Sequence, residues 1–291
     1  MRAVRIGPYQ VGDGHPAFIV AEAGINHNGR LDLALQLVAA AHKAGCQAIK
    51  FQKRTVDVVY TAAELARPRE SVFGATNGDL KHGLEFGSHE YAEIDRACRT
   101  AGLLWFASCW DSASLDFIEA FNPPCYKIAS PCITDRELLE HHRRTGRPML
   151  LSTGMSTLEE IDAAVETLGT DNLVLLHCTS TYPSRVDELN LKVIDQLAQR
   201  YQVPVGYSGH EVGLATTVAA VARGAAVVER HLTLDRAMWG SDQPASIEPH
   251  GFERLVKDIR AVESALGDGV KRVYPSEMGA LEKLRRIRSL P

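Results

Sequence analysis

The sequence predicts a TIM barrel, a closed (β/α)8 barrel, preceded by a β-hairpin. Eight apolar segments alternate with eight helical patterns between Ala17 and Leu266, and about 250 residues is the usual length of such a barrel. The apolar segments are continuous runs, which is typical of parallel strands covered on both faces. A doubly wound open sheet is the alternative, because the alternation of strands and helices does not by itself distinguish the two folds.

Each element follows from a local pattern. Two short apolar runs around a Gly-Pro turn predict a hairpin over residues 4–14. Apolar runs predict the strands Ala17–Gly24, Ala48–Gln52, Leu103–Cys109, Tyr126–Ser130, Met149–Thr153, Leu173–Thr179, Val203–Tyr207 and Ala225–Leu232. Helical spacing predicts the helices Leu31–Ala44, His89–Thr100, Ala113–Phe121, Asp135–Arg144, Leu158–Leu168, Leu191–Arg200, Leu214–Ala222 and Gly251–Leu266. Glycines typical of left-handed helix ends stand at Gly45, Gly102, Gly146, Gly169, Gly224 and Gly267.

The barrel and its hairpin are predicted to occupy residues 1–267, and no second domain is expected. Residues 268–291 form a tail with a basic run at 283–288. We expect this tail to be a helix that lies on the barrel exterior and turns its charges to solvent.

The composition is ordinary for a soluble globular protein and gives no support to nucleic-acid or membrane binding. A net charge of -4 gives no support to nucleic-acid binding. No apolar run approaches the roughly 20 residues that span a bilayer, and no leader pattern opens the chain, so a cytoplasmic protein is expected. No CxxC pair occurs among the six cysteines, and buried reduced thiols explain them best.

Two histidines at the ends of the last two predicted strands indicate a metal-binding corner. Strand alternation puts Ser208 and His210 on one face, and Glu229 and His231 on one face of the next strand. Neutral imidazole binds Zn, Mn or Fe, and two imidazoles leave coordination positions for water and substrate. The alternative is that each histidine is a hydrogen-bonded structural residue.

Other polar residues gather at the same strand ends, where the loops of a TIM barrel build its active site. The predicted lumen-facing set is Glu22, Lys50, Gln52, Ser108, Lys127, Ser130, Ser152, Ser208 and Glu229, and the run 179–183 adds Ser180 and Tyr182. Lysines inside apolar strands indicate an anionic ligand, because burying an unpaired ammonium costs several kcal/mol. Serine hydroxyls suit phosphate or carboxylate oxygens. The alternative is that the two glutamates pair with the lysines.

Nucleotide chemistry is disfavoured, since neither GxGxxG nor GxxxxGK[ST] occurs. The colinear motifs instead resemble those of the sialic acid synthase family, enzymes that condense phosphoenolpyruvate with an N-acetylmannosamine-type sugar. The matching stretches are AEAGINHNG at 21–29, IKFQ at 49–52, YKIAS at 126–130, LSTGMS at 151–156, LHCTSTYP at 176–183, GYSGHE at 206–211 and ERHLTLDRAMWGSDQPASIEP at 229–249.

The resemblance implies a role for each site residue. It implies a divalent metal held by His210 and His231, Mn before Mg or Co, and catalysis by Glu22, Lys50, Lys127 and His231. Phosphoenolpyruvate would contact Lys50, Ser108, Lys127, Ser130, Ser152, Ser180 and Ser208. The sugar or metal-bound groups would contact Gln52, Tyr182, Glu229 and Asp242.

Some features differ from the family pattern. Cys132 stands where a Glu is common and Gly209 where an Asp is common, and the sugar-side loop at 67–86 is shorter and differently composed. Many members continue into an antifreeze-like domain that reaches the partner's site, and a homodimer is expected here. Three alternatives stay open: a different aldose such as a diacetamido-trideoxy hexose or a sugar phosphate, a non-catalytic barrel that binds phosphoenolpyruvate or a sugar acid, and a two-histidine metal hydrolase.

Overall fold

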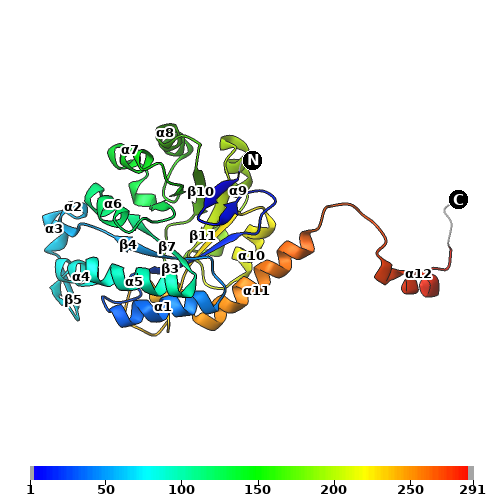
Figure 1. The fold of residues 1–291 in the computed structure, drawn as a ribbon, viewed down its shortest axis with the longest axis horizontal. Helices are drawn as coiled ribbons and strands as arrows, with labels where there is room; N and C mark the ends of the chain where they lie inside the picture. The colour runs from blue at the N-terminus through cyan, green and yellow to red at the C-terminus, as the bar shows by residue number, and fades with distance from the viewer. Residues whose placement is uncertain (1–2, 288–291) are drawn as a thin grey trace.

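The computed structural model describes residues 3–287, and it confirms the predicted TIM barrel (Figure 1). Eight parallel strands close in the order β10-β11-β12-β3-β4-β7-β8-β9. These strands are β3 Phe18–Gly24, β4 Ala48–Lys53, β7 Leu104–Cys109, β8 Tyr126–Ile128, β9 Met149–Ser152, β10 Leu173–Cys178, β11 Val205–Gly209 and β12 Val227–His231. The doubly wound alternative is therefore excluded.

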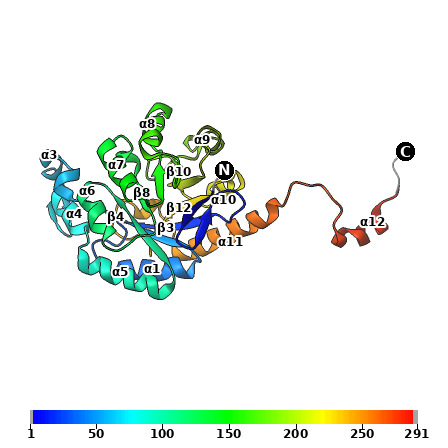
Figure 2. The same cartoon turned by 45° about the horizontal axis from the view of Figure 1, so that its top comes forward.

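Helices that follow the barrel strands surround them, as Figures 1 and 2 show. They are α1 Leu31–Lys43, α5 Ser88–Ala101, α6 Ser112–Glu119, α7 Arg136–Arg144, α8 Leu158–Leu168, α9 Val193–Tyr201, α10 Ala215–Ala222 and α11 Pro249–Leu266. Capping residues mark where some of them begin. Thr157 and Glu160, for example, form a reciprocal capping box at the start of α8. The six predicted helix-ending glycines all have positive φ. Gly102 has the left-handed helical conformation predicted for them, whereas Gly169 and Gly267 end their helices with an extended ψ.

The lumen has an apolar layer near the amino ends of the strands. The predicted hairpin is present as β1 Val4–Ile6 and β2 Tyr9–Val11. Its buried side chains Val4, Ile6 and Val11 pack against lumen residues such as Phe18 and Phe106. This packing fills the amino end of the barrel, so the open cavity lies at the carboxyl end.

The chain between β4 and α5 contains short elements that the sequence did not predict. They are α2 Val56–Val59, α3 Ala62–Leu65, β5 Pro68–Ser71, β6 Gly74–Thr76 and α4 Asn77–Leu84. Elements of three to eight residues are too short to leave a sustained hydrophobic period. This excursion is tied to the barrel by Lys53, whose Nζ donates to Glu85 Oε2 at 3.1 Å and to the Phe86 carbonyl at 2.9 Å.

The expected packing of the tail was wrong. Helix α12, Met278–Leu284, follows the short 3-10 helix η4, Pro275–Glu277, but it stands away from the barrel in both views (Figures 1 and 2). No residue of α12 is buried, because residues 267–274 run exposed and carry it clear of the barrel surface. Positions 288–291 of the predicted tail lie outside the described residues, as do positions 1–2 of the predicted barrel domain.

The cysteines agree with their predicted state, since all six are buried free thiols. Among the helices of residues 3–287, none combines the length and hydrophobicity that crossing a lipid bilayer would require.

Candidate active site

A cavity of about 280 Å³ opens at the carboxyl ends of the barrel strands. Strand register places its polar residues side by side: Glu22 lies between Lys50 on β4 and His231 on β12, and Ser208 lies beside Glu229. Every predicted site residue except Asp242 lines this cavity. The lining is Glu22, Lys50, Gln52, Ser108, Trp110, Lys127, Ala129, Ser130, Pro131, Ser152, Met155, Cys178, Ser180, Tyr182, Ser208, His210, Glu229 and His231.

Five of these lining residues were missed from sequence: Trp110, Ala129, Pro131, Met155 and Cys178. The prediction of cavity-lining residues included only polar side chains at strand ends. Trp110 directly follows β7 and Cys178 ends β10. Their positions at strand ends were the available signal.

The two lumen lysines pair with the two lumen glutamates. Lys50 Nζ lies 3.3 Å from Glu22 Oε2 and 3.1 Å from Glu229 Oε1, and Lys127 Nζ lies 2.7 Å from Glu229 Oε1. All four side chains are 4% exposed or less. The alternative left open by the sequence is thus realised, and burial of the lysines does not by itself require an anionic ligand.

The glutamates nevertheless differ in charge state. Burial raises the pKa of Glu22 to about 7; the Lys50 ammonium opposes this rise and the Glu229 carboxylate adds to it. Burial also acts to raise the pKa of Glu229, but Lys127 and Lys50 outweigh it and hold that pKa below its ordinary value. When Glu22 is protonated, two ammonium groups face one carboxylate. The cluster is then net positive and can accept an anion.

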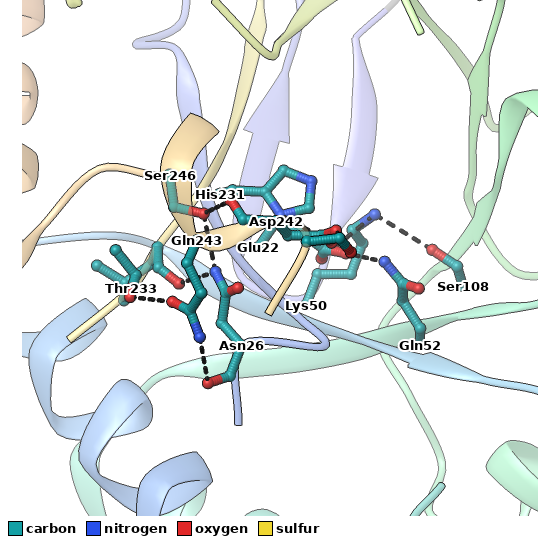
Figure 3. Close-up of polar contacts among 12 residues, drawn as sticks. Glu22, Asn26, Lys50, Gln52, Ser108, His231, Thr233, Asp242, Gln243 and Ser246 are labelled. Atoms are coloured by element: carbon teal, nitrogen blue, oxygen red, sulfur yellow. Dashed lines mark hydrogen bonds and ion pairs between the residues drawn. The ribbon is translucent and has the colours of Figure 1, made fainter. Parts of the chain in front are cut away.

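Hydrogen bonds orient the groups around this cluster. Gln52 Nε2 donates to Glu22 Oε1 at 2.7 Å, and Lys50 Nζ donates to Ser108 Oγ at 3.2 Å (Figure 3). Ser208 Oγ donates to Glu229 Oε1 at 3.1 Å. Within residues 3–287, Glu229 Oε2 has no hydrogen-bond partner, and Glu22 Oε2 has none besides its ion-pair contact with Lys50. Glu229 therefore keeps one oxygen available for a ligand hydroxyl or water.

The two histidines lie close together beside Glu22, which pairs in register with His231. Their ring centroids are 5.6 Å apart, and the ring of Tyr182 packs 4.3 Å from that of His210. His210 Nδ1 lies 2.8 Å from the Thr179 carbonyl oxygen, which assigns the proton to Nδ1 and leaves the Nε2 lone pair free. Burial lowers the pKa of both imidazoles to about 3. The neighbouring His231 adds to this effect for His210, and the ammonium groups of Lys50 and Lys127 add to it for His231. Both rings are neutral at pH 7.

The donor set fits a divalent metal completed by non-protein ligands. His231 Nδ1 is buried without a hydrogen-bond partner among the described residues, and Asp242 Oδ2 lies 3.8 Å away. No group of three or more His, Cys, Asp or Glu able to hold a metal occurs in the part of the chain described here. Two imidazoles would therefore hold the ion, with water and substrate oxygens filling the other positions.

Asp242 is fixed beside His231 by the loop after β12. Asn26 Nδ2 donates to Ser246 Oγ at 2.8 Å, and Ser246 Oγ donates to the Asp242 carbonyl at 2.7 Å (Figure 3). Gln243 Nε2 donates back to the Asn26 carbonyl at 3.3 Å. Burial raises the pKa of Asp242. These hydrogen bonds fix the backbone of Asp242 and so hold its carboxyl at the edge of the cavity. Asp242 does not line the cavity itself.

Comparison with known proteins gives consistent results. The family model described as the NeuB family matches residues 37–271. The chain is similar to N-acetylneuraminate-9-phosphate synthase of Homo sapiens, at 40% identity over 280 residues, 94% of this chain and 78% of that protein. It is similar to N,N'-diacetyllegionaminic acid synthase of Legionella pneumophila, at 35% identity over 285 residues, 94% of this chain and 80% of that protein. The solved structure of N-acetylneuraminic acid (sialic acid) synthetase from Leptospira borgpetersenii, in complex with citrate, matches with a TM-score of 0.86 at 31% identity over 98% of both chains.

Proposed function

The chain belongs to the NeuB family, and we propose that it condenses phosphoenolpyruvate with an N-acetylmannosamine-type aldose to give a nonulosonic acid and phosphate. One observation carries the proposal: two buried ammonium groups and two neutral imidazoles line the same cavity. The first pair suits an acid with a phosphate and a carboxylate, and the second suits a metal that binds a carbonyl oxygen.

Lys50 and Lys127 bind the anionic groups of phosphoenolpyruvate in this proposal. An incoming phosphate or carboxylate takes hydrogen bonds from the two ammonium groups, which now point at Glu229. Bonds to charged groups are worth about 1.5–3 kcal/mol each. The hydroxyls of Ser108 and Ser208, already bonded within the cluster, are near enough to join them.

His210 and His231 would hold the divalent metal, Mn first with Mg or Co as alternatives. When bound, the metal supplies Lewis acidity to the aldehyde oxygen of the open-chain sugar. In this proposal Gln52 and Tyr182, which line the cavity, and Asp242 at its edge contact the sugar or the metal-bound groups. Holding both substrates in one enclosed site removes most of the entropic cost of bringing them together.

Glu22 is placed to act on the carbon that bears the phosphate. The methylene carbon of phosphoenolpyruvate bonds to the aldehyde carbon, the aldehyde oxygen takes the proton of Glu22, and positive charge forms at the neighbouring carbon that bears the phosphate. Water adds to that carbon and the ionised Glu22 accepts one of its protons. The carbon–oxygen bond to phosphate then breaks, and the hydroxyl left by the water gives its proton to the departing phosphate, which leaves the 2-keto acid. A carboxyl whose pKa lies near 7 is suited to accepting and returning a proton at neutral pH.

A phosphorylated aldose is the second candidate substrate, and a neighbouring cavity favours it. This cavity of about 300 Å³ is lined by two cations, Arg69 and Lys81, one acid, Glu70, and Ser241, among other residues. Ser241 Oγ donates to Asp242 Oδ1 at 2.8 Å, so the cavity adjoins the edge of the active site. The Lys81 charge acts on Asp242. Two cations at this place suit a phosphate at the far end of the sugar.

A phosphate-release assay tests these proposals. Release should need both phosphoenolpyruvate and an aldose, and it should collapse on chelation or in His231→Ala. Free aldoses, 6-phosphorylated aldoses and diacetamido-trideoxy hexoses, compared in one assay, identify the sugar. Binding of phosphoenolpyruvate without release for any sugar would instead support the non-catalytic barrel. We also propose a homodimer, which light scattering tests.

A further inference from the structure

A buried ion pair between Glu211 and Arg230 lies directly behind the two imidazoles. Both side chains are 0% exposed, and Arg230 Nη1 lies 3.0 Å from Glu211 Oε1. Glu211 follows His210 in the chain, and Arg230 precedes His231. Arg230 and His231 are consecutive in β12 and therefore point to opposite faces of it, and His210 and Glu211 directly follow the neighbouring strand β11. The two imidazoles line the cavity, and the ion pair does not.

The Arg230 guanidinium joins the two strands through four acceptors. Nη1 donates to Glu211 Oε1, to Thr217 Oγ1 at 2.6 Å and to the Gly213 carbonyl at 3.0 Å, and Nη2 donates to the Glu211 carbonyl at 2.5 Å. Two of these acceptors are backbone carbonyls of the loop that begins immediately after His210. Arg230, which precedes His231, thus fixes the backbone that follows His210.

The Glu211 carboxylate is equally constrained. It accepts hydrogen bonds from Tyr207 Oη at 2.8 Å, Thr216 Oγ1 at 2.7 Å and Thr217 Oγ1 at 3.0 Å. A Cβ on Gly209 would lie 2.7 Å from Glu211 Oε2 and 2.7 Å from the Tyr207 ring. The absence of a side chain at Gly209 is therefore what makes room for this carboxylate between the strand and its helix.

Such a pair is not explained by stability. Replacing a buried ion pair with well-packed apolar residues is often neutral or stabilising, because removing two charges from water costs much of what their attraction returns. The outward face of these strands otherwise carries core residues such as Val228. A network with fixed bond directions does provide what apolar packing does not, a single arrangement of the two strand ends.

We propose that Glu211 and Arg230 are positioning residues that hold His210 and His231 at the spacing needed to bind the divalent metal together. This inference rests on the proposed function, because it assumes that the two imidazoles share a metal. Neither residue touches the cavity, so their effect reaches the metal only through the backbone of the two histidines.

The test is the affinity of the metal-free protein for Mn²⁺, measured by titration calorimetry without substrates. Glu211→Gln keeps the size of the side chain and removes its charge, and it should weaken Mn²⁺ binding about 10- to 100-fold, as supporting residues around metal ligands do. Binding of phosphoenolpyruvate measured without metal should change less than about twofold, because Lys50 and Lys127 lie on other strands. Glu211→Asp, which restores the charge, should recover part of the Mn²⁺ affinity.

Glu119→Gln is a matched control. Glu119 likewise accepts from a tyrosine, Tyr126, and pairs with an arginine, Arg147, but at the amino ends of the strands. It should lower the unfolding temperature and leave the Mn²⁺ affinity unchanged. If Glu211→Gln fails to fold, Thr217→Val removes one acceptor of Arg230 and keeps the ion pair, and it should weaken Mn²⁺ binding severalfold.

The outcomes distinguish failure of the positioning role from failure of the proposed metal site. Unchanged Mn²⁺ affinity in folded Glu211→Gln or Thr217→Val overturns the positioning role. Equal losses of Mn²⁺ affinity in Glu211→Gln and Glu119→Gln would also overturn it, since general destabilisation would then be the cause. If the wild-type protein binds no Mn²⁺, or if His231→Ala binds it as well as wild type, the proposed metal site fails instead.

Discussion

Replacing Glu22 with glutamine should stabilise the metal-free protein much more at pH 8 than at pH 4.5, relative to wild type. Glu22 is 1% exposed. Burial raises its pKa to about 7 against the opposing charge of Lys50, with a further contribution from Glu229. The unfolded chain has the ordinary value of 4.5. Between these values the folded state holds a proton that the unfolded state has lost, so wild-type stability falls as pH rises from about 4.5 to about 7.

The size of this effect follows from the two pKa values. Each factor of ten in proton affinity is worth about 1.4 kcal/mol, so the difference between about 7 and 4.5 corresponds to about 3 kcal/mol. That stability is fully present below pH 4.5 and fully lost above pH 7. Glutamine has a similar shape and does not titrate, so Glu22→Gln lacks this loss and should gain about 3 kcal/mol over wild type across the interval.

Reversible urea unfolding of both proteins at pH 4.5 and pH 8, with chelator present, measures the effect. Glu166→Gln, which removes an exposed carboxylate on α8, serves as the control for replacing a carboxylate that is not buried. A difference between Glu22→Gln and wild type that stays constant within about 1 kcal/mol would refute the reasoning. Glu22 would then be ionised as it is in water and would not be tuned to proton transfer near pH 7.

Three other predictions follow from packing and charge. Lys127→Met should raise the dissociation constant of phosphoenolpyruvate about 10- to 150-fold, because one charge-assisted hydrogen bond is lost; unchanged binding in a calorimetric titration would contradict it. Gly209→Ala should destabilise the protein by about 1–3 kcal/mol in urea unfolding, since its Cβ would meet Glu211 and Tyr207 at 2.7 Å. The control Gly279→Ala has no atom within 4 Å of the added Cβ and should have little effect. Ending the chain at Gly269 should leave the melting temperature nearly unchanged, because no residue of α12 is buried; a fall of more than about 5 °C, roughly 1–3 kcal/mol for a chain of this size, would show that the tail does contribute.

The barrel and most of the residues around its cavity could be predicted from the sequence because both depend on local periodicity. Lys50 and Gln52 share a face whatever surrounds the strand, since side-chain direction alternates with each residue. The same rule placed His210 and His231 at adjacent strand ends once the order of the strands was known. The excursion α2 to α4 was missed because its elements are too short to show such a periodicity.

Other features depend on distances between segments far apart in the chain. The sequence left open whether Glu22 and Glu229 or a ligand neutralises the lysines. In the structure the lysine Nζ atoms lie 2.7–3.3 Å from the carboxylate oxygens of these two glutamates. The pKa of Glu22 depends on burial and on charges contributed by other strands.

By itself, the sequence determined the strand and helix pattern and the faces on which the polar side chains lie, because backbone geometry repeats along each element. It favoured a closed barrel, and the tertiary structure decided between that barrel and an open sheet. Only the tertiary structure decided which charges pair, where the tail lies and how Arg230 connects the two histidine strands. Those outcomes depend on register and packing between distant segments, and no local pattern encodes the distance between two side chains on different strands.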